Sequence, residues 1–369
     1  IRGGNLYFAN PEIELASATN SPTESLFTQN DTSGISLVPV YPETSGLSSN
    51  WFHHAIKKVL DVRRLTLTEL VDPIPEAMLI KYHLPILTTA LIWIHAPKDL
   101  KNAAVARKRF AFEEVFFIQL ARLRAKAEYQ KPGATAVTLI PTSLNNFIAR
   151  FPFPLTKAQQ KAIEQIAKDL SDSKPMMRLL EGDVGSGKTA VAAATAFAVV
   201  QAGFAVAYMA PTEILARQHF ESFINYFNPP AGGPVIQIGL ITGSECRKFP
   251  SKINPAEHTH ISRPQLLKWV ANGEIPILIG THALIQQAVK FKNLAYVIID
   301  EQHRFGVMQR AKLARKNNER APHLLSMTAT PIPRTLALTI YGDLDLSLLD
   351  EMPAGRKPIK TEVVAENKR

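Results

Sequence analysis

The feature that most limits what this chain can fold into is a glycine-rich stretch between an apolar run and an alanine-rich run. It consists of Gly182, Asp183, Val184, Gly185, Ser186, Gly187, Lys188 and Thr189. This spacing matches the G-x-x-x-x-G-K-[ST] loop, in which backbone N–H groups and the start of the following helix hold the phosphates of a nucleotide. In such a loop the Lys188 ammonium faces the β- and γ-phosphates of ATP, and the Thr189 hydroxyl is a ligand of Mg²⁺. A chance glycine-rich turn is the alternative, and the strand and helix patterns on either side argue against it.

Short apolar runs alternate with helical stretches from residue 151 onward. This alternation predicts an α/β fold with a parallel sheet between layers of helices. The expected strands are 178–181, 205–209, 235–241, 276–279, 296–299 and 324–327. The uncharged segment between Lys188 and Glu213 is long enough to suggest a membrane span, but Gly203 and its neighbours divide it into a helix and a strand. We therefore expect no contact with a membrane.

Two adjacent acids, Asp300 and Glu301, follow the apolar run 297–299. Open α/β sheets bind their ligands at the carboxyl ends of the strands, which is where these acids would lie. Asp300 is predicted to face Mg²⁺, usually through water, and Glu301 to position and deprotonate the attacking water. A strand that simply ends in a polar loop is the alternative, and the glycine-rich loop earlier in the same sheet argues against it.

Two further strand ends carry small polar groups that suit a nucleic-acid backbone. These residues are Pro211, Thr212, Gly280, Thr281 and His282. Their backbone N–H groups and hydroxyls could bind sugar and phosphate without reading the base sequence. Because both segments also open helices, ordinary N-capping explains each of them about equally well.

Other polar residues have weaker signals. Gln159, upstream of the glycine-rich loop, could pair with the edge of adenine, although an exposed surface glutamine is the commoner outcome. Thr328 and Thr330 follow the last apolar run and offer hydroxyls at its end.

Bulk properties agree with a phosphate-binding partner. Lys and Arg number 42 against 32 Asp and Glu, a formal charge of +10, although solubility alone would also explain such a balance. One cysteine, Cys246, excludes an internal disulfide and fits the cytosol. Residues 1–45 read as the end of a β-rich unit that starts before the chain does, and residues 46–150 as a helical spacer.

The motifs occur in the order and wording of superfamily 2 helicases, and they resemble the RecG family in particular. The matching segments read GDVGSGKT, APTEILARQH, GTHALI, VIIDEQHRFGV and SMTATPIPRTLA. The resemblance implies a RecA-like sheet, the first helicase lobe, over residues 151–369. It also implies a helical linker at 46–150, and at 1–45 the close of an OB-fold wedge domain that holds branched DNA.

The same resemblance implies an ATP-dependent DNA helicase or translocase that uses Mg²⁺ and remodels stalled forks and Holliday junctions in repair and recombination. It implies a monomer in the bacterial cytosol whose partner is branched double-stranded DNA. Catalysis falls to Lys188, Thr189, Asp300 and Glu301, and adenine binding to Gln159. The residues that couple nucleotide state to DNA grip would be Gln302, His303, Thr328 and Thr330.

The sequence departs from that family at its end. After residue 358 it enters what resembles the first strand of a second lobe and stops at Arg369. The later motifs, which normally supply an arginine finger worth about 10³ to 10⁵ in turnover, are absent. We expect these 369 residues to bind nucleotide and to hydrolyse it poorly.

Two rival interpretations remain. The transcription-repair coupling translocase shares much of this wording but typically has a second acid where Gln302 stands. A nucleic-acid-binding module with a decayed nucleotide site would be expected to have lost one of Lys188, Thr189, Asp300 and Glu301. Alanine at Lys188 separates a motor from a passive binder.

Overall fold

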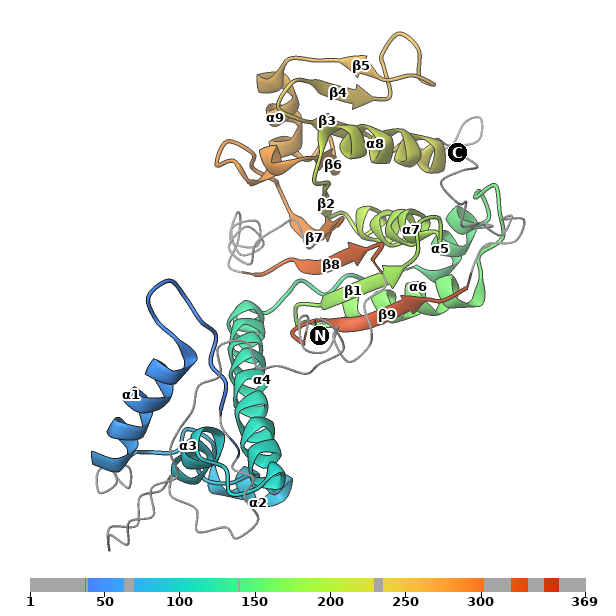
Figure 1. Cartoon of the computed structure of the whole chain (residues 1–369). Helices are drawn as coiled ribbons and strands as arrows, with labels where there is room; N and C mark the ends of the chain where they lie inside the picture. Colours follow the sequence, from blue (N-terminus) through green and yellow to red (C-terminus); the bar gives the residue numbers. More distant parts are fainter. Residues whose placement is uncertain are drawn as a thin grey trace, which may run out of the picture. The chain divides into compact units, whose positions relative to one another are not determined.

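The computed structural model describes residues 37, 39–62, 70–138, 140–228, 235–301, 320–330 and 342–351. The chain divides into two compact units, Ile1–Phe117 and Ile118–Arg369 (Figure 1). Most of the β-rich unit expected at 1–45 lies outside the described residues, so it stays a prediction.

Helices make up the described part of the first unit. They are α1 (Ser49–Val62), α2 (Glu76–Tyr82), α3 (Leu87–His95) and the first part of α4 (Leu100–Gln130). Asp99 caps α4, because its carboxylate accepts a hydrogen bond of 2.6 Å from the Asn102 N–H. Helix α4 runs from this cap to Gln130, shortly before Pro132 and Gly133.

One buried arginine ties these helices together. The Arg109 side chain is 0% exposed and forms ion pairs with Asp72 at 2.7 Å and with Glu113 at 2.5 Å. Asp72 also accepts the Leu87 N–H at the start of α3, at 2.8 Å. A guanidinium presents its donors in a fixed fork, so it holds both carboxylates in one geometry.

No single described helix is long and apolar enough to cross a membrane. Helices α2 and α3 together have the length and the composition of a membrane span, but the pair is bent by 51°. The uncharged segment after Lys188 divides as the sequence predicts. Helix α7 (Lys188–Gln201) ends before Gly203, and strand β2 (Ala205–Met209) follows.

A nine-stranded sheet forms the second unit, in the order β5-β4-β3-β6-β2-β7-β8-β1-β9. Its other strands are β1 (Met177–Gly182), β3 (Ile238–Ile241), β4 (Cys246–Phe249), β5 (Thr259–His260), β6 (Ile277–Gly280), β7 (Leu294–Ile299), β8 (His323–Thr328) and β9 (Asp345–Leu349). Neighbours from β3 to β9 run parallel, whereas β4 pairs antiparallel with β3 and β5. The α/β class and all six expected strands are confirmed, with β3 three residues shorter at its start than the expected 235–241.

Helices cover both faces of the sheet, and the alternation along each strand decides which face a residue joins. Along β2, Tyr208 packs in one core with α6 (Lys157–Leu170), α7 and α8 (Glu213–Phe227). Ala207 and Met209 pack in the other core, with α9 (Arg263–Asn272). Because the central strands are buried on both faces, their sequences are continuous apolar runs rather than alternating ones.

The described residues after α4 pack with the sheet. Helix α5 (Pro141–Ile148) places the Phe147 ring parallel to that of Phe197 on α7, with centroids 4.1 Å apart. Segment 118–150 therefore belongs to the second compact unit, although the sequence suggested a boundary near residue 150.

Candidate active site

The glycine-rich loop links β1 to α7 at the carboxyl edge of the sheet. Gly185 and Gly187 have φ values of 81° and 88°, which only glycine adopts without strain. The Lys188 ammonium donates hydrogen bonds to the carbonyl oxygens of Gly182 at 2.6 Å and Asp183 at 2.9 Å. The loop thus curls around its own lysine at the start of a helix, where backbone N–H groups attract an anion.

Carboxylates surround this lysine. Burial lowers the pKa of Lys188, and the negative charges near it oppose that shift, that of Asp300 most strongly. The other two carboxylates are those of Glu301 and Asp183. The structure therefore brings together the lysine and the two adjacent acids, which lie more than 100 residues apart in the sequence.

Asp300 follows β7, and its carboxylate is held on both oxygens. Oδ1 accepts the Glu301 N–H at 3.0 Å, and Oδ2 accepts from His219 Nε2 at 2.7 Å. The backbone of Glu301 has a φ of 50°, an unusual value for a residue with a side chain. Strained residues of this kind cluster at functional sites.

The donor set fits Mg²⁺ bound together with a nucleotide. Among the described residues, no group of three His, Cys, Asp or Glu side chains could hold a metal alone. Mg²⁺ with nucleotides needs less from a protein, because phosphates and water fill most of its octahedron. The Thr189 hydroxyl and the Asp300 carboxylate are hard oxygen donors beside Lys188, as that arrangement requires.

Gln159 is fully buried and is bonded to the glycine-rich loop. Its Nε2 donates to the Ser186 carbonyl oxygen at 2.8 Å, and its Oε1 accepts the Thr156 N–H at 2.9 Å. Thr156 in turn caps α6 through the Gln159 N–H, which completes a capping box. Both polar atoms of the amide have partners and the side chain is 0% exposed, so the adenine contact stays a prediction, to which the structure adds a contact with the loop.

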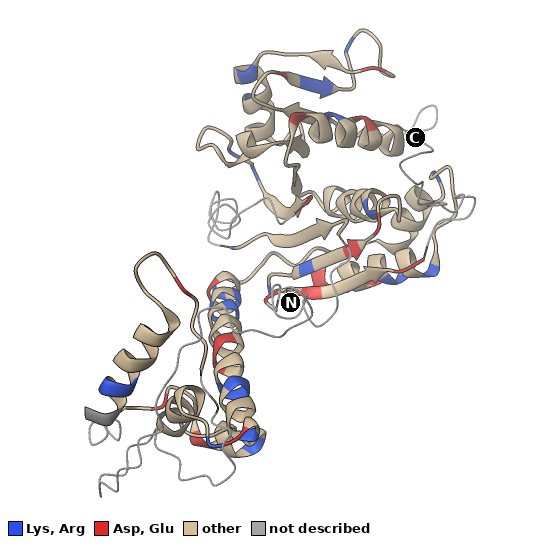
Figure 2. Cartoon of the chain, viewed as in Figure 1, with Lys and Arg blue, Asp and Glu red and all other residues tan. Residues whose placement is uncertain are grey.

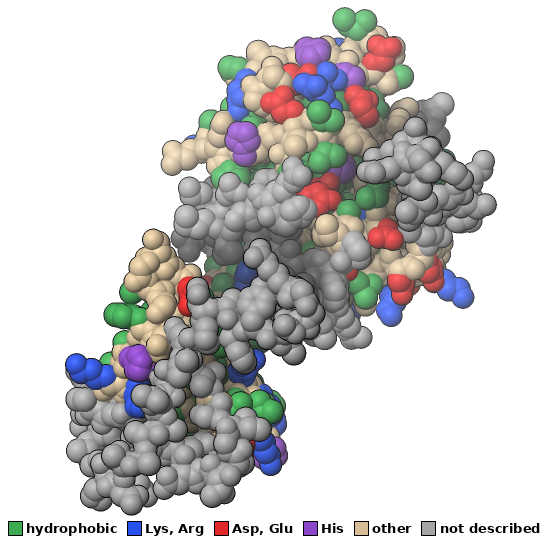
Figure 3. Space-filling view, viewed as in Figure 1, with side chains coloured by type: hydrophobic (Ala, Val, Ile, Leu, Met, Phe, Trp, Pro, Cys, Tyr) green, Lys and Arg blue, Asp and Glu red, His purple; other side chains and the backbone are tan. Residues whose placement is uncertain are grey.

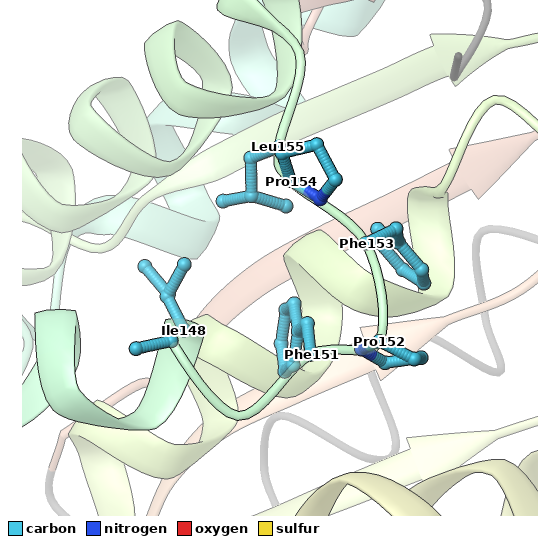
Figure 4. Close-up of a pocket in the computed structure, with 7 residues that line it drawn as sticks. Ile148, Phe151, Pro152, Phe153, Pro154 and Leu155 are labelled. Atoms are coloured by element: carbon cyan, nitrogen blue, oxygen red, sulfur yellow. The ribbon is translucent and has the colours of Figure 1, made fainter.

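An apolar pocket of about 360 Å³ lies upstream of α6 (Figure 4). It is lined by Ile148, Ala149, Phe151, Pro152, Phe153, Pro154 and Leu155. Aromatic and apolar walls of this kind suit a flat ring. Sequence patterns did not point to this pocket, because a Pro-rich loop gives no periodic signal.

Two of the four expected coupling residues can be described. The hydroxyls of Thr328 and Thr330 are 2.8 Å apart at the end of β8, beside β1. Gln302 and His303 lie outside the described residues, so their coupling role stays a prediction.

The first expected DNA-contact segment caps a helix and joins a second loop. The Thr212 hydroxyl accepts the Leu215 N–H at the start of α8. Its neighbour Glu213 accepts hydrogen bonds from Gly243 N–H at 2.9 Å and from the Ser244 hydroxyl at 2.6 Å. The loop 242–244 thus lies beside Pro211 and Thr212, a neighbour that sequence reasoning missed although a Thr-Gly-Ser turn after a strand was visible.

In the second segment, Gly280 and Thr281 are buried and His282 is exposed. A side chain at Gly280 would overlap with the Ile241 carbonyl oxygen, so the two strands β3 and β6 approach closely there. The Ala210 N–H donates to the Gly280 carbonyl oxygen at 2.8 Å, which joins both predicted DNA segments.

Charges are distributed over both units, with Lys and Arg on several helices (Figure 2). Acidic and basic side chains lie close together over β4 and α8 (Figure 3). Arg247 pairs with Glu221 and with Glu245, and Arg217 pairs with Glu213 and Glu245. This cluster has two guanidiniums and three carboxylates, so it is no basic patch.

Sequence reasoning also missed Tyr208 and His219, which are polar residues buried next to Asp300. The Tyr208 hydroxyl lies 3.1 Å from His219 Nδ1. Burial raises the pKa of Tyr208 well above its usual value, and the charge of Asp300 adds to this rise. The sequence offered two weak signals. One was a tyrosine within an apolar strand, which is usually a core residue, and the other was the histidine that ends the segment APTEILARQH.

Comparisons with known proteins agree with this geometry. A model of the DEAD/DEAH box helicase family matches residues 156–339. The ATP-dependent DNA helicase RecG of Synechocystis is 41% identical over 98% of this chain and 40% of that protein, and RecG of Aquifex aeolicus is 45% identical over 80% of this chain and 36% of that protein. A structure of RecG bound to a three-way DNA junction shares 38% identity with a TM-score of 0.68, and it covers 87% of this chain and 40% of that chain.

The chain thus spans about two fifths of the length of these relatives. Similarity extends over nearly all of it, including the glycine-rich loop and the acid pair. This chain therefore belongs to the RecG family of DEAD/DEAH box helicases.

Proposed function

We propose that this chain is the ATP-binding part of an ATP-dependent DNA helicase that acts on branched DNA, including stalled forks and Holliday junctions, in repair and recombination. The observation that carries the proposal is the Lys188 ammonium at the head of α7, which is bonded to carbonyl oxygens of the glycine-rich loop and is influenced by three carboxylates. An ammonium that faces acids and a helix N-terminus suits a triphosphate with its metal ion.

The residues divide the work as follows. Backbone amides of 183–188 and the Lys188 ammonium hold the β- and γ-phosphates, and Thr189 and Asp300 hold Mg²⁺. Bound there, Mg²⁺ neutralises charge on the transferred phosphate. Glu301 orients the attacking water and accepts its proton.

Adenine has a candidate place beside the loop 148–155, which precedes Gln159 in the sequence. The aromatic wall offers stacking, which holds any base, whereas an amide contact from Gln159 would select adenine. Gln159 would then serve both the base and the loop.

DNA would contact the sheet edge at Pro211, Thr212, Gly280, Thr281 and His282. Thr328 and Thr330, with Gln302 and His303, would transmit the state of the nucleotide to that contact. The relative solved with a three-way DNA junction supports branched DNA as the partner. We further propose that the protein works as a monomer in the bacterial cytoplasm, without a membrane partner.

The test is ATP-driven unwinding of a labelled three-way DNA junction by a form of the protein extended to the length of its relatives. We expect unwinding by the wild type and none by Lys188→Ala, which should still bind the junction. Unwinding by Lys188→Ala would contradict the proposed role of Lys188. Junction binding without any ATP effect in the wild type would favour a passive binder with a decayed nucleotide site.

A further inference from the structure

A chain of buried polar groups links the two residues proposed to hold Mg²⁺. His219 Nε2 lies 2.7 Å from Asp300 Oδ2, and His219 Nδ1 lies 3.1 Å from the Tyr208 hydroxyl. The Thr189 side chain is near enough to that hydroxyl to oppose the rise of the Tyr208 pKa. The groups that join the glycine-rich loop to the acid pair therefore come from β2 and α8, which carry no nucleotide motif.

A neutral His219 has one proton arrangement that suits both of its partners. Asp300 only accepts, so His219 donates from Nε2 and accepts at Nδ1. Tyr208 then donates to Nδ1. In this arrangement the Asp300 carboxylate is fixed in direction.

Packing holds the linking pair rigidly. Tyr208 is 0% exposed and His219 is 8% exposed. Their ring centroids are 4.7 Å apart, and Tyr208 also packs edge-on against Phe223 of α8. Buried rings have few alternative rotamers, so a side chain bonded to them is held in one place.

We infer that His219 and Tyr208 are positioning residues that hold Asp300 in the geometry for Mg²⁺. This inference rests on the proposed nucleotide site. Residues that orient metal ligands typically change metal affinity by about 10 to 100-fold when they are replaced. His219 also lies two turns along α8 from Thr212, so the helix that starts at the proposed DNA contact carries the group that orients Asp300.

The test compares the affinity of a fluorescent ADP analogue in excess Mg²⁺ with its affinity in EDTA. For His219→Phe we expect the gain from Mg²⁺ to fall by about 10-fold, with little change in EDTA. His219→Gln keeps a donor toward Asp300 and should retain more of the gain. Tyr208→Phe should lose part of it, whereas Tyr296→Phe should not. Tyr296 is an equally buried tyrosine on the neighbouring strand, bonded to Thr195 instead.

Each outcome decides between the alternatives. A wild-type gain from Mg²⁺ that survives in His219→Phe and Tyr208→Phe overturns the inference and leaves the nucleotide site standing. An equal loss with and without Mg²⁺ shows a merely structural role and overturns it as well. If His219→Phe fails to fold, Tyr208→Phe against Tyr296→Phe decides. Absence of nucleotide binding or of a Mg²⁺ effect in the wild type overturns the inference, and absence of binding overturns the proposed site too.

Discussion

Replacing Gln159 by alanine separates two roles for this residue. The substitution removes the amide that bonds the Ser186 carbonyl oxygen and the Thr156 N–H. A buried backbone group left without a partner costs about 1–3 kcal/mol, and the Thr156 N–H, which is only partly buried, should cost the lower figure. We therefore expect a loss of about 2–4 kcal/mol in the free energy of unfolding, which a domain of ordinary stability survives.

The same substitution should weaken phosphate binding. Without its anchor the loop is less ordered, and ordering it again on binding costs about 1–2 kcal/mol, a factor of about 5 to 30 in affinity. Because this cost concerns the loop and not the base, inorganic tripolyphosphate and ADP should lose affinity alike.

The assay combines urea unfolding with displacement of a fluorescent ADP analogue by ADP and by tripolyphosphate. The control is Gln160→Ala, the exposed neighbour on the same helix, whose amide donates to the Leu155 carbonyl oxygen at 3.3 Å. A variant of Gln159 with unchanged tripolyphosphate affinity and weakened ADP affinity would refute the reasoning. Gln159 would then serve only the base.

Three further perturbations test other parts of the structure. Gly187→Ala should abolish nucleotide binding in titrations, because its Cβ would overlap with the Gln159 amide at a φ of 88°; binding as tight as in the wild type would contradict this. Arg109→Met should cost about 3 kcal/mol in urea unfolding by leaving two carboxylates unpaired, with unchanged nucleotide affinity, and a change below about 1 kcal/mol would show that the ion pairs contribute little. The Ser244 hydrogen bond lowers the pKa of Glu213. The stabilisation by the ionised Glu213 carboxylate is therefore complete above the usual carboxyl pKa of about 4.3, and it is lost as the pH falls through the lower pKa of the folded protein. Glu213→Gln should therefore flatten the stability profile between about pH 5 and pH 3, and an unaltered profile would exclude this contribution.

The central strands and the phosphate loop could be predicted from sequence because their signals are local. A continuous apolar run followed by Gly182 has few structural solutions, and two acids after 297–299 belong at a strand end. The order of the strands was not needed to place the loop and the acids at one edge, because all parallel strands end at the same edge of the sheet.

Features that depend on contacts distant in sequence escaped prediction. Strands β4, β5 and β9 are short or mixed in polarity, so neither alternation nor an apolar run marks them. The link from His219 to Asp300 joins residues 81 positions apart, and the sequence of α8 alone gives no reason to bury a histidine. Gln159 looked like a surface residue because its bonds to the loop appear only in three dimensions.

The most direct test of the account is equilibrium binding of a nonhydrolysable ATP analogue with Mg²⁺ to the 369-residue chain and to its Lys188→Ala variant. A charged hydrogen-bonding group contributes about 1.5–3 kcal/mol, so the variant should bind about 10 to 100-fold more weakly, with an unchanged circular dichroism spectrum. Equal affinity in the two proteins, or no binding by the wild type, would contradict the site.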